Sequence, residues 1–292
     1  MNCKHLCIYV LFFNFDGCKS FVSNNDIFAF KPELDKDYHY VISKQTSKQW
    51  RFNNVDNVIN DTADMDITFR CIAYHDSGYG CKLIFNDYKL KRHPFTATFN
   101  NTGNFHPVKF VNPFAVLDSL GKYVHGTFLK VEINKEGIAD SVSGLDDLLA
   151  SVSAKANIDK ASAERQLRDY ISANAVKDLL NPFFSIPLGK KIKEGDMWSS
   201  NFTLVTLAPV KINSNYLLKN TSEGVLHLEI SSTIYSQHGE GDPVPLRGNM
   251  NGSAVFDYKS GMLEFYNTDA ETVTKTTAYD VTEKTHLQLK KY

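Results

Sequence analysis

The stretch GTFLKVEINKEGIADSVSGLDDLLASV, residues 126–152, contains both structural periods that recur along this chain. Its first part places every second residue on one face, as a half-buried β-strand requires: Thr127, Leu129, Val131 and Ile133. The polar run NKEG, residues 134–137, predicts a tight turn before a second alternating run at 138–142. Apolar residues then follow at helical spacing: Leu145, Leu148, Leu149 and Val152. The stretch therefore predicts a hairpin followed by a helix.

Period-two alternation dominates the rest of the chain. Residues 67–73 and 81–85 predict two strands around a turn at 75–80, and residues 253–267 predict a hairpin with its turn at 259–261. One predicted strand places four aliphatic residues on one face: Leu226, Leu228, Ile230 and Ile234. Residues 271–289 are rich in Thr, Val and Tyr, which favour a pleated surface. These runs predict an antiparallel sheet with one solvated face.

Two helices are expected in the middle, near 144–155 and 159–180. Ser143 followed by Asp146 predicts a capping box for the first helix, and Asn181–Pro182 should end the second. The predicted fold class is α+β, mainly antiparallel β, with a large curved sheet or half-barrel wrapped over two central helices. A plain α+β sandwich is the alternative.

Composition limits the function classes. The chain has 292 residues and a formal net charge of −1, so it lacks the basic excess that nucleic-acid binding requires. Its 9 prolines and 16 glycines argue against a disordered chain. We expect a single mainly-β domain over residues 35–292.

The N-terminus predicts export. Lys4 and His5 precede an apolar run at residues 6–15, which is too short for a membrane-spanning helix of about 20 residues. A weakly basic start followed by a short apolar run is typical of a secretory signal. We therefore expect a signal peptide at 1–17 and a flexible polar tether at 18–34.

Cys18 decides between two kinds of export signal. Gly17 suits a lipoprotein signal, in which a small residue precedes the lipidated cysteine, whereas Phe15 and Asp16 fit that pattern poorly. A competing cleavage after Ser20 predicts ordinary secretion, and an uncleaved cytoplasmic start is the third alternative. Lipidation at Cys18 is the favoured prediction. It implies a cell-envelope protein, periplasmic or anchored in a membrane by lipid, with a secreted protein as the alternative.

Cys71 and Cys81 lie on the apolar face of the two strands around residues 75–80. A turn centred near Ser77–Gly78 would set Cys81 opposite Tyr74, so a disulfide between the cysteines needs a different loop. The alternatives are a disulfide and two buried free thiols. The chain has no C-x-x-C motif, which excludes a zinc ribbon.

Two segments resemble an uncharacterised family of Bacteroidota cell-envelope proteins. They are VEINKEGIADSVSGLDDLLASV and IPLGKKIKEGDMWSSNFTL, at residues 131–152 and 186–204. The positions that carry the resemblance are Asn134, Gly137, Val142, Gly144, Gly195, Asp196 and Trp198. The resemblance implies a secretion or lipoprotein signal and structural roles for these residues. The layout also resembles, more distantly, the lipoprotein-carrier half-barrel, which shelters acyl chains.

The motif Gly195–Asp196–Met197–Trp198 has a structural interpretation of its own. Gly and Asp favour a turn from which a strand can leave, and Trp198 would then anchor the core. A Trp198 that lines a ligand site is the alternative.

The sequence contains no H-E-x-x-H, G-x-S-x-G or P-loop motif, so we predict a non-enzymatic protein without a metal or cofactor. The favoured function is a binding or carrier module for an apolar ligand such as a lipid. The alternative is an envelope structural or protein-interaction module with a filled core, and a hydrolase is a third hypothesis. Expected partners are a membrane, reached through the lipid anchor, and an apolar ligand.

Overall fold

The computed structural model describes residues 28–52, 55–92, 96–98, 115–134, 138–167, 171–184, 190–204, 210–236, 245–275 and 280–292. The first half of the chain contains the strands β1 (Tyr38–Phe52), β2 (Val55–His75), β3 (Gly78–Arg92), β4 (Thr96–Thr98), β5 (Phe128–Asn134) and β6 (Ala139–Ser143). The second half contains β7 (Met197–Leu204), β8 (Val210–Ser222), β9 (Val225–Ser236), β10 (Leu246–Asp257), β11 (Leu263–Lys275) and β12 (Asp280–Lys291). Helical segments are α1 (Ala115–Val124), α2 (Leu145–Ala156), α3 (Lys160–Leu167), α4 (Ala173–Leu180) and the 3₁₀ turn η1 (Asn181–Phe184).

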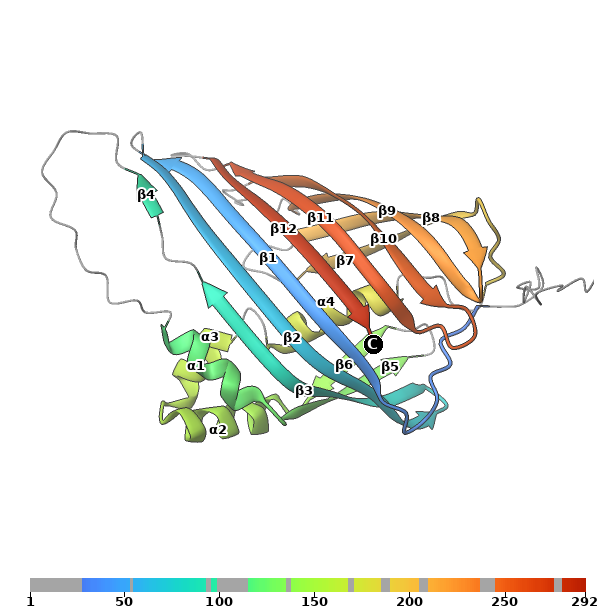
Figure 1. Ribbon diagram of the computed structural model, residues 1–292, viewed down its shortest axis with the longest axis horizontal. Coiled ribbons are helices and arrows are strands. Elements are labelled where there is room, and N and C mark those ends of the chain that lie inside the picture. Colours follow the sequence, from blue (N-terminus) through green and yellow to red (C-terminus); the bar gives the residue numbers. More distant parts are fainter. Residues whose placement is uncertain are drawn as a thin grey trace, which may run out of the picture.

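The described strands form one large open antiparallel sheet. Its order is β6-β5-β3-β2-β1-β12-β11-β10-β9-β8-β7, and β4 pairs with β2 beside this path. Strands close in sequence are neighbours within each half, and the halves meet where β1 pairs with β12, from Tyr40–Lys291 to Trp50–Val281. The first and last strands of the chain therefore join the two halves (Figure 1).

One face of this sheet, here called the inner face, packs against helical residues. Phe183 of η1 lies with its ring centroid 4.7 Å from that of Tyr40 and 5.9 Å from that of Phe69. Val176 and Leu180 of α4 are buried in the same cluster. The four aliphatic residues predicted to share a face in β9, Leu226, Leu228, Ile230 and Ile234, are all buried, which confirms that prediction. The opposite side is called the outer face.

The predicted wrapping of the sheet over two central helices is not confirmed. The helices α1, α2 and α3 gather at one end, next to β3 and β5, and α4 with η1 lies on the inner face behind β1 and β12 in Figure 1. The predicted helix at 159–180 is also wrong as one element, because α3 ends at Leu167 and α4 begins at Ala173. Ser172 restarts the helix, since its Oγ accepts a hydrogen bond from the Ala175 amide at 3.1 Å.

The predicted capping box at Ser143 is wrong as well. Ser143 is the last residue of β6 and pairs with Lys130 of β5. Gly144 is the N-cap of α2, with φ 90° and no side-chain capping bond. Asp146 instead accepts a hydrogen bond from the Lys160 ammonium at 2.6 Å. Strand pairing leaves Ser143 in an extended conformation, so a glycine makes the turn into the helix.

Helix α1 was not predicted. Leu120 and Val124 are fully buried, but Gly121 between them resembles a helix breaker in the sequence. The glycine allows close packing, because a Cβ at this position would lie 2.3 Å from the Tyr88 carbonyl oxygen of β3. The close contact with β3 thus explains why a glycine stands inside this helix.

The predicted tether at 18–34 is wrong in its last part. Phe28 and Phe30 are buried in the main core. The Phe28 amide donates to the Lys190 carbonyl at 3.1 Å, and the Lys31 amide donates to the Ser260 carbonyl at 2.8 Å. Residues 28–31 therefore contact the folded domain, whereas the predicted signal at 1–17 lies outside the described residues.

Candidate functional site

Two residues of the first family motif have structural roles: Asn134 stabilises the turn of the β5–β6 hairpin, and Gly144 is the N-cap of α2. The Ile138 amide donates to the Asn134 side-chain oxygen at 2.9 Å, and the Asn134 amide donates to the Ile138 carbonyl at the same distance. Gly137 lies outside the described residues, and Gly144 begins α2. Val142 is half-buried against the core. These residues shape the backbone rather than a binding surface.

The second motif forms the turn that leads into β7. Gly195 has φ 86°, which favours glycine, and the Asp196 carboxylate accepts a hydrogen bond from the Lys193 amide at 2.9 Å. Trp198 is half-buried and stacks on Tyr216 of β8, with 5.8 Å between ring centroids and 15° between planes. It also packs against the main core. Trp198 thus contributes to packing at the edge of the inner face.

Cys71 and Cys81 form a disulfide in the structure, with 4.0 Å between their Cα atoms. The turn lies at Asp76–Ser77, one residue earlier than expected, and His75 pairs with Gly78. A β-bulge between Cys71 and Ala73 then shifts the register so that Cys71 faces Cys81. Both cysteines are buried, as their alternation indicated. Sequence reasoning missed the bulge because a bulge carries no strong residue signal.

Cys18 lies outside the described residues, as do residues 1–17. Within the ranges that are described, no helix has the length and hydrophobicity needed to cross a bilayer. The same ranges contain no group of three His, Cys, Asp or Glu side chains arranged to hold a metal ion.

A second apolar cluster lies on the inner face and consists of strand residues alone. Its members are the buried Val210, Ile212 and Ile234 and the half-buried Phe202, Leu246, Met250 and Ala270. We call it the strand-only cluster. The buried residues of the helices all belong to the other, larger cluster. The strand-only cluster therefore extends the apolar inner face past the part that the described helices cover.

Polar side chains lie beside the two clusters, which Met250 connects because it packs against both. Ser232 donates a hydrogen bond to Ser214 at 2.8 Å, and both serines are buried between apolar neighbours. Towards the middle of the sheet, Lys48 forms an ion pair with Glu283 at 3.1 Å. Both ion-pair partners are half-buried on the inner face. The inner face thus presents hydroxyl and charged groups beside apolar ones, as an amphipathic ligand would require.

Asp178 of α4 is a titratable group close enough to Lys44 of β1 to interact with its charge. Burial raises the pKa of its carboxyl group to about 6, and the nearby positive charge of Lys44 on β1 acts in the opposite direction. Lys44 is itself half-buried on the inner face. The carboxyl group therefore titrates in a pH range where an ordinary aspartate is fully ionised.

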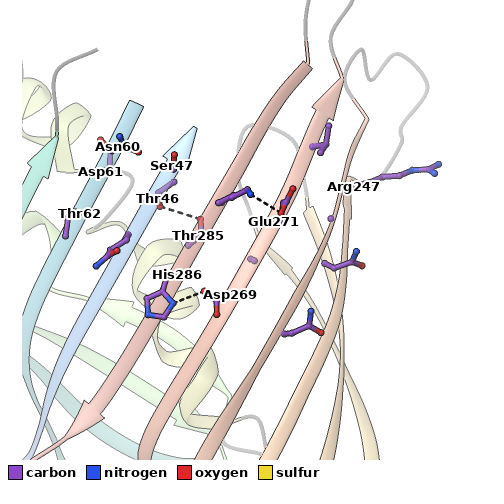
Figure 2. Close-up of a pocket in the computed structure, with 17 residues that line it drawn as sticks. Thr46, Ser47, Asn60, Asp61, Thr62, Arg247, Asp269, Glu271, Thr285 and His286 are labelled. Carbon is purple, nitrogen blue, oxygen red and sulfur yellow. Dashed lines mark hydrogen bonds and ion pairs between the residues drawn. The ribbon is translucent and has the colours of Figure 1, made fainter. Parts of the chain in front are cut away.

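An open hollow of about 990 Å³ lies on the outer face, across β2, β1, β12, β11 and β10 (Figure 2). Most of the residues that line it have polar side chains, among them Arg247, Asn249, Asn251, Asp269, Glu271, Lys284 and His286. Lys284 pairs with Glu271 at 3.5 Å, and His286 Nδ1 lies 2.8 Å from an Asp269 carboxylate oxygen.

The His286–Asp269 pair has two of the three groups of a nucleophilic triad. A nucleophilic triad needs a serine, threonine or cysteine hydrogen-bonded to the histidine. Among the described residues, no hydroxyl or thiol forms a hydrogen bond with His286, and the Asp269 side chain is 76% exposed. The pair therefore acts as a cross-strand contact between β12 and β11.

The sequence matches the model of DUF6263, a family of unknown function, over residues 60–263. No curated protein matches it. The matched segment contains both motifs on which the predicted family resemblance rested.

Three solved structures align with this chain. A structure on lipid–protein interactions in lipovitellin has a TM-score of 0.50 and 12% identity over 89% of this chain, which spans about a quarter (25%) of the lipovitellin chain. OccK7 (OpdD) of Pseudomonas aeruginosa has a TM-score of 0.24 and 6% identity, over 88% of this chain and 99% of its own. The translocator domain of the autotransporter NalP from Neisseria meningitidis has a TM-score of 0.21 and 7% identity, over 90% and 91%. Only the lipovitellin likeness is close enough to inform the fold.

Proposed function

This chain belongs to the DUF6263 family, a family of unknown function, and we propose that it is a non-enzymatic module that binds an apolar ligand, of the lipid class, on its inner face. The observation that carries the proposal is the strand-only cluster. Its half-buried members Phe202 and Leu246 pack against this cluster and not against the one that contains the buried helix residues, and Met250 packs against both. Removing apolar surface from water is favourable by about 25 cal/mol per Å².

The chemistry of the neighbouring groups supports a lipid over a purely apolar molecule. Ser214, Ser232 and the Lys48–Glu283 pair adjoin the cluster, so a head group could form hydrogen bonds while its chain packs on Met250. The lipovitellin structure concerns lipid–protein interactions, and the likeness of fold supports the same ligand class.

The second candidate is a structural or protein-interaction module with a filled core. The packing of Phe183 against Tyr40 and Phe69 favours it, because aromatic rings occupy the space between η1 and the sheet. In this alternative the strand-only cluster serves the stability of β7–β10 and binds no small ligand.

Ligand binding can be measured with a fluorescent fatty acid and two lysine variants of β10. Met250 faces the inner side and Asn251 faces the outer side, so Met250→Lys and Asn251→Lys add the same charge to opposite faces. We expect Met250→Lys to weaken binding about ten-fold, because a charge beside the bound chain is costly to desolvate. Asn251→Lys should leave binding unchanged. Equal effects, or no binding by the folded wild-type protein, would favour the second candidate.

We also propose that the protein is exported to the cell envelope and anchored through Cys18. The apolar run at 6–15, Gly17 and the resemblance to Bacteroidota envelope proteins support this. The described residues begin at Phe28, which is buried in the main core.

Replacement of Cys18 tests the anchor. We expect wild-type protein to incorporate a fatty-acid analogue and to sediment with membranes, and Cys18→Ser to lose both properties while keeping its thermal unfolding midpoint. A single acyl chain binds membranes weakly and two or more bind firmly, so the change in partition should be large. An unlabelled wild-type protein whose mature N-terminus follows Ser20 would instead indicate ordinary secretion.

A further inference from the structure

The two edges of the sheet differ in how they are protected. The β6 edge is five residues long, and α4 packs beside it. The Lys177 ammonium of α4 donates a hydrogen bond to the Asp140 carbonyl of β6 at 2.5 Å. The β7 edge is eight residues long, and among the described strands only β8 pairs with it. Among the described strands, none pairs with the other side of β7.

The composition of β7 also sets it apart. Its sequence, MWSSNFTL, contains no charged residue and no proline, whereas every other described strand of five residues or more contains a charged side chain. Charged residues and proline are the usual means by which edge strands avoid pairing with other chains. Met197 at the start of β7 is 71% exposed. An unprotected edge of this kind can accept another strand.

We propose that β7 pairs antiparallel with β7 of a second copy of this chain, about a two-fold axis through Ser200. An axis perpendicular to the sheet keeps the inner faces of both copies on one side, so residues of the same face must oppose each other. With Ser200 on the axis, Trp198 of each copy lies opposite Phe202 of the other. Ser199 then lies opposite Asn201 on the outer face.

The side chains of β7 suit this register. Trp198 and Phe202 are both half-buried on the inner face, where they pair with Tyr216 and Ile212 of β8. Aromatic pairs across antiparallel strands contribute about 0.2–1 kcal/mol each, and the two-fold axis makes the contact twice. The small Ser200 at the axis leaves room for both aromatic pairs. Because β7 carries no charge, self-pairing brings no like charges together.

The oligomeric state of the purified full chain tests the proposal. Sedimentation should give twice the 33.0 kDa mass of one chain. Asn201→Lys places two lysines close to the axis, and we expect it to raise the dissociation constant of the dimer about ten-fold or more. The matched control is Ser231→Lys, which adds a lysine at an exposed outer-face position of β9, away from the edge.

A charge-pair variant tests the register itself. The double variant Ser199→Glu with Asn201→Lys sets opposite charges across the axis, because residue 199 of one copy faces residue 201 of the other. We expect it to restore dimerisation. A monomeric wild-type chain, a dimer unaffected by Asn201→Lys, or a double variant that stays as weak as Asn201→Lys would each overturn the proposal.

Discussion

Asp178 brings a half-buried carboxyl group onto the helix that lies against the inner face. Burial raises its pKa to about 6 from the usual 3.8, with Lys44 opposing the shift. Between about pH 4 and 6 the native state holds a proton that the unfolded chain has already lost. The native state is therefore stabilised at the acidic end of this window, and stability falls as the pH rises through it.

The substitution Asp178→Asn should remove this dependence of folding stability on pH. We expect the free energy of unfolding at pH 7 to rise by about 1 kcal/mol, because the amide carries no charge to desolvate and solvent screens a half-buried group. Urea unfolding at pH 4.5 and pH 7 measures the effect. Asp147→Asn, at an exposed position on α2, is the control. The same change in both variants would show that the burial of Asp178 is not its cause.

At the scale of elements, β10 contains two glycines on the inner face, Gly248 and Gly252, which allow close contact with β11. A Cβ at Gly252 would lie 2.1 Å from the Asn267 carbonyl oxygen and 2.6 Å from the Thr268 methyl carbon. Gly248 is equally close to Glu271 and Thr272. Glycine inside a strand commonly marks a site where another backbone approaches.

Gly252→Ala should therefore destabilise the protein, although alanine is a small residue. A clash with backbone atoms forces the strands apart, and overpacking of this kind costs about 1–3 kcal/mol. Ser253→Ala, one residue along on the exposed outer face, should change stability by less than about 0.5 kcal/mol. Chemical unfolding of both variants measures the difference. Equal stability of the two would contradict the close approach at Gly252.

Helices and strands were predicted correctly where the spacing of apolar residues matches the period of the element. Helix α2 begins and ends within one residue of its predicted bounds, and Leu148, Leu149 and Val152 of its stripe are buried. The predicted helix at 159–180 missed the cap at Ser172, because a serine inside an apolar period resembles an ordinary helical residue. Helix α1 was missed because a glycine inside a helix is locally unfavourable. Gly121 is present there because it allows close packing of α1 against β3.

At the scale of the whole molecule, two meanders share one sheet and one main core. The Tyr40 hydroxyl of β1 donates to the Leu263 carbonyl of β11 at 2.9 Å, across a sequence separation of 223 residues. Phe28 lies beside Tyr258, with ring centroids 6.1 Å apart. Phe28 and Tyr40 therefore both contact the β10–β11 hairpin, which lies more than 200 residues later in the chain.

The sequence by itself determined the mainly antiparallel class, the hairpins at 126–143 and 253–267, and the buried direction of both cysteines. These features depend on alternation between near neighbours, which is visible in any short window. Only the tertiary structure decided that β1 joins β12, that a bulge sets Cys71 opposite Cys81, and that a strand-only cluster lies beyond the helices. Each of these depends on the register between residues far apart in the chain. That register is set by which side chains fit against each other once the strands have paired.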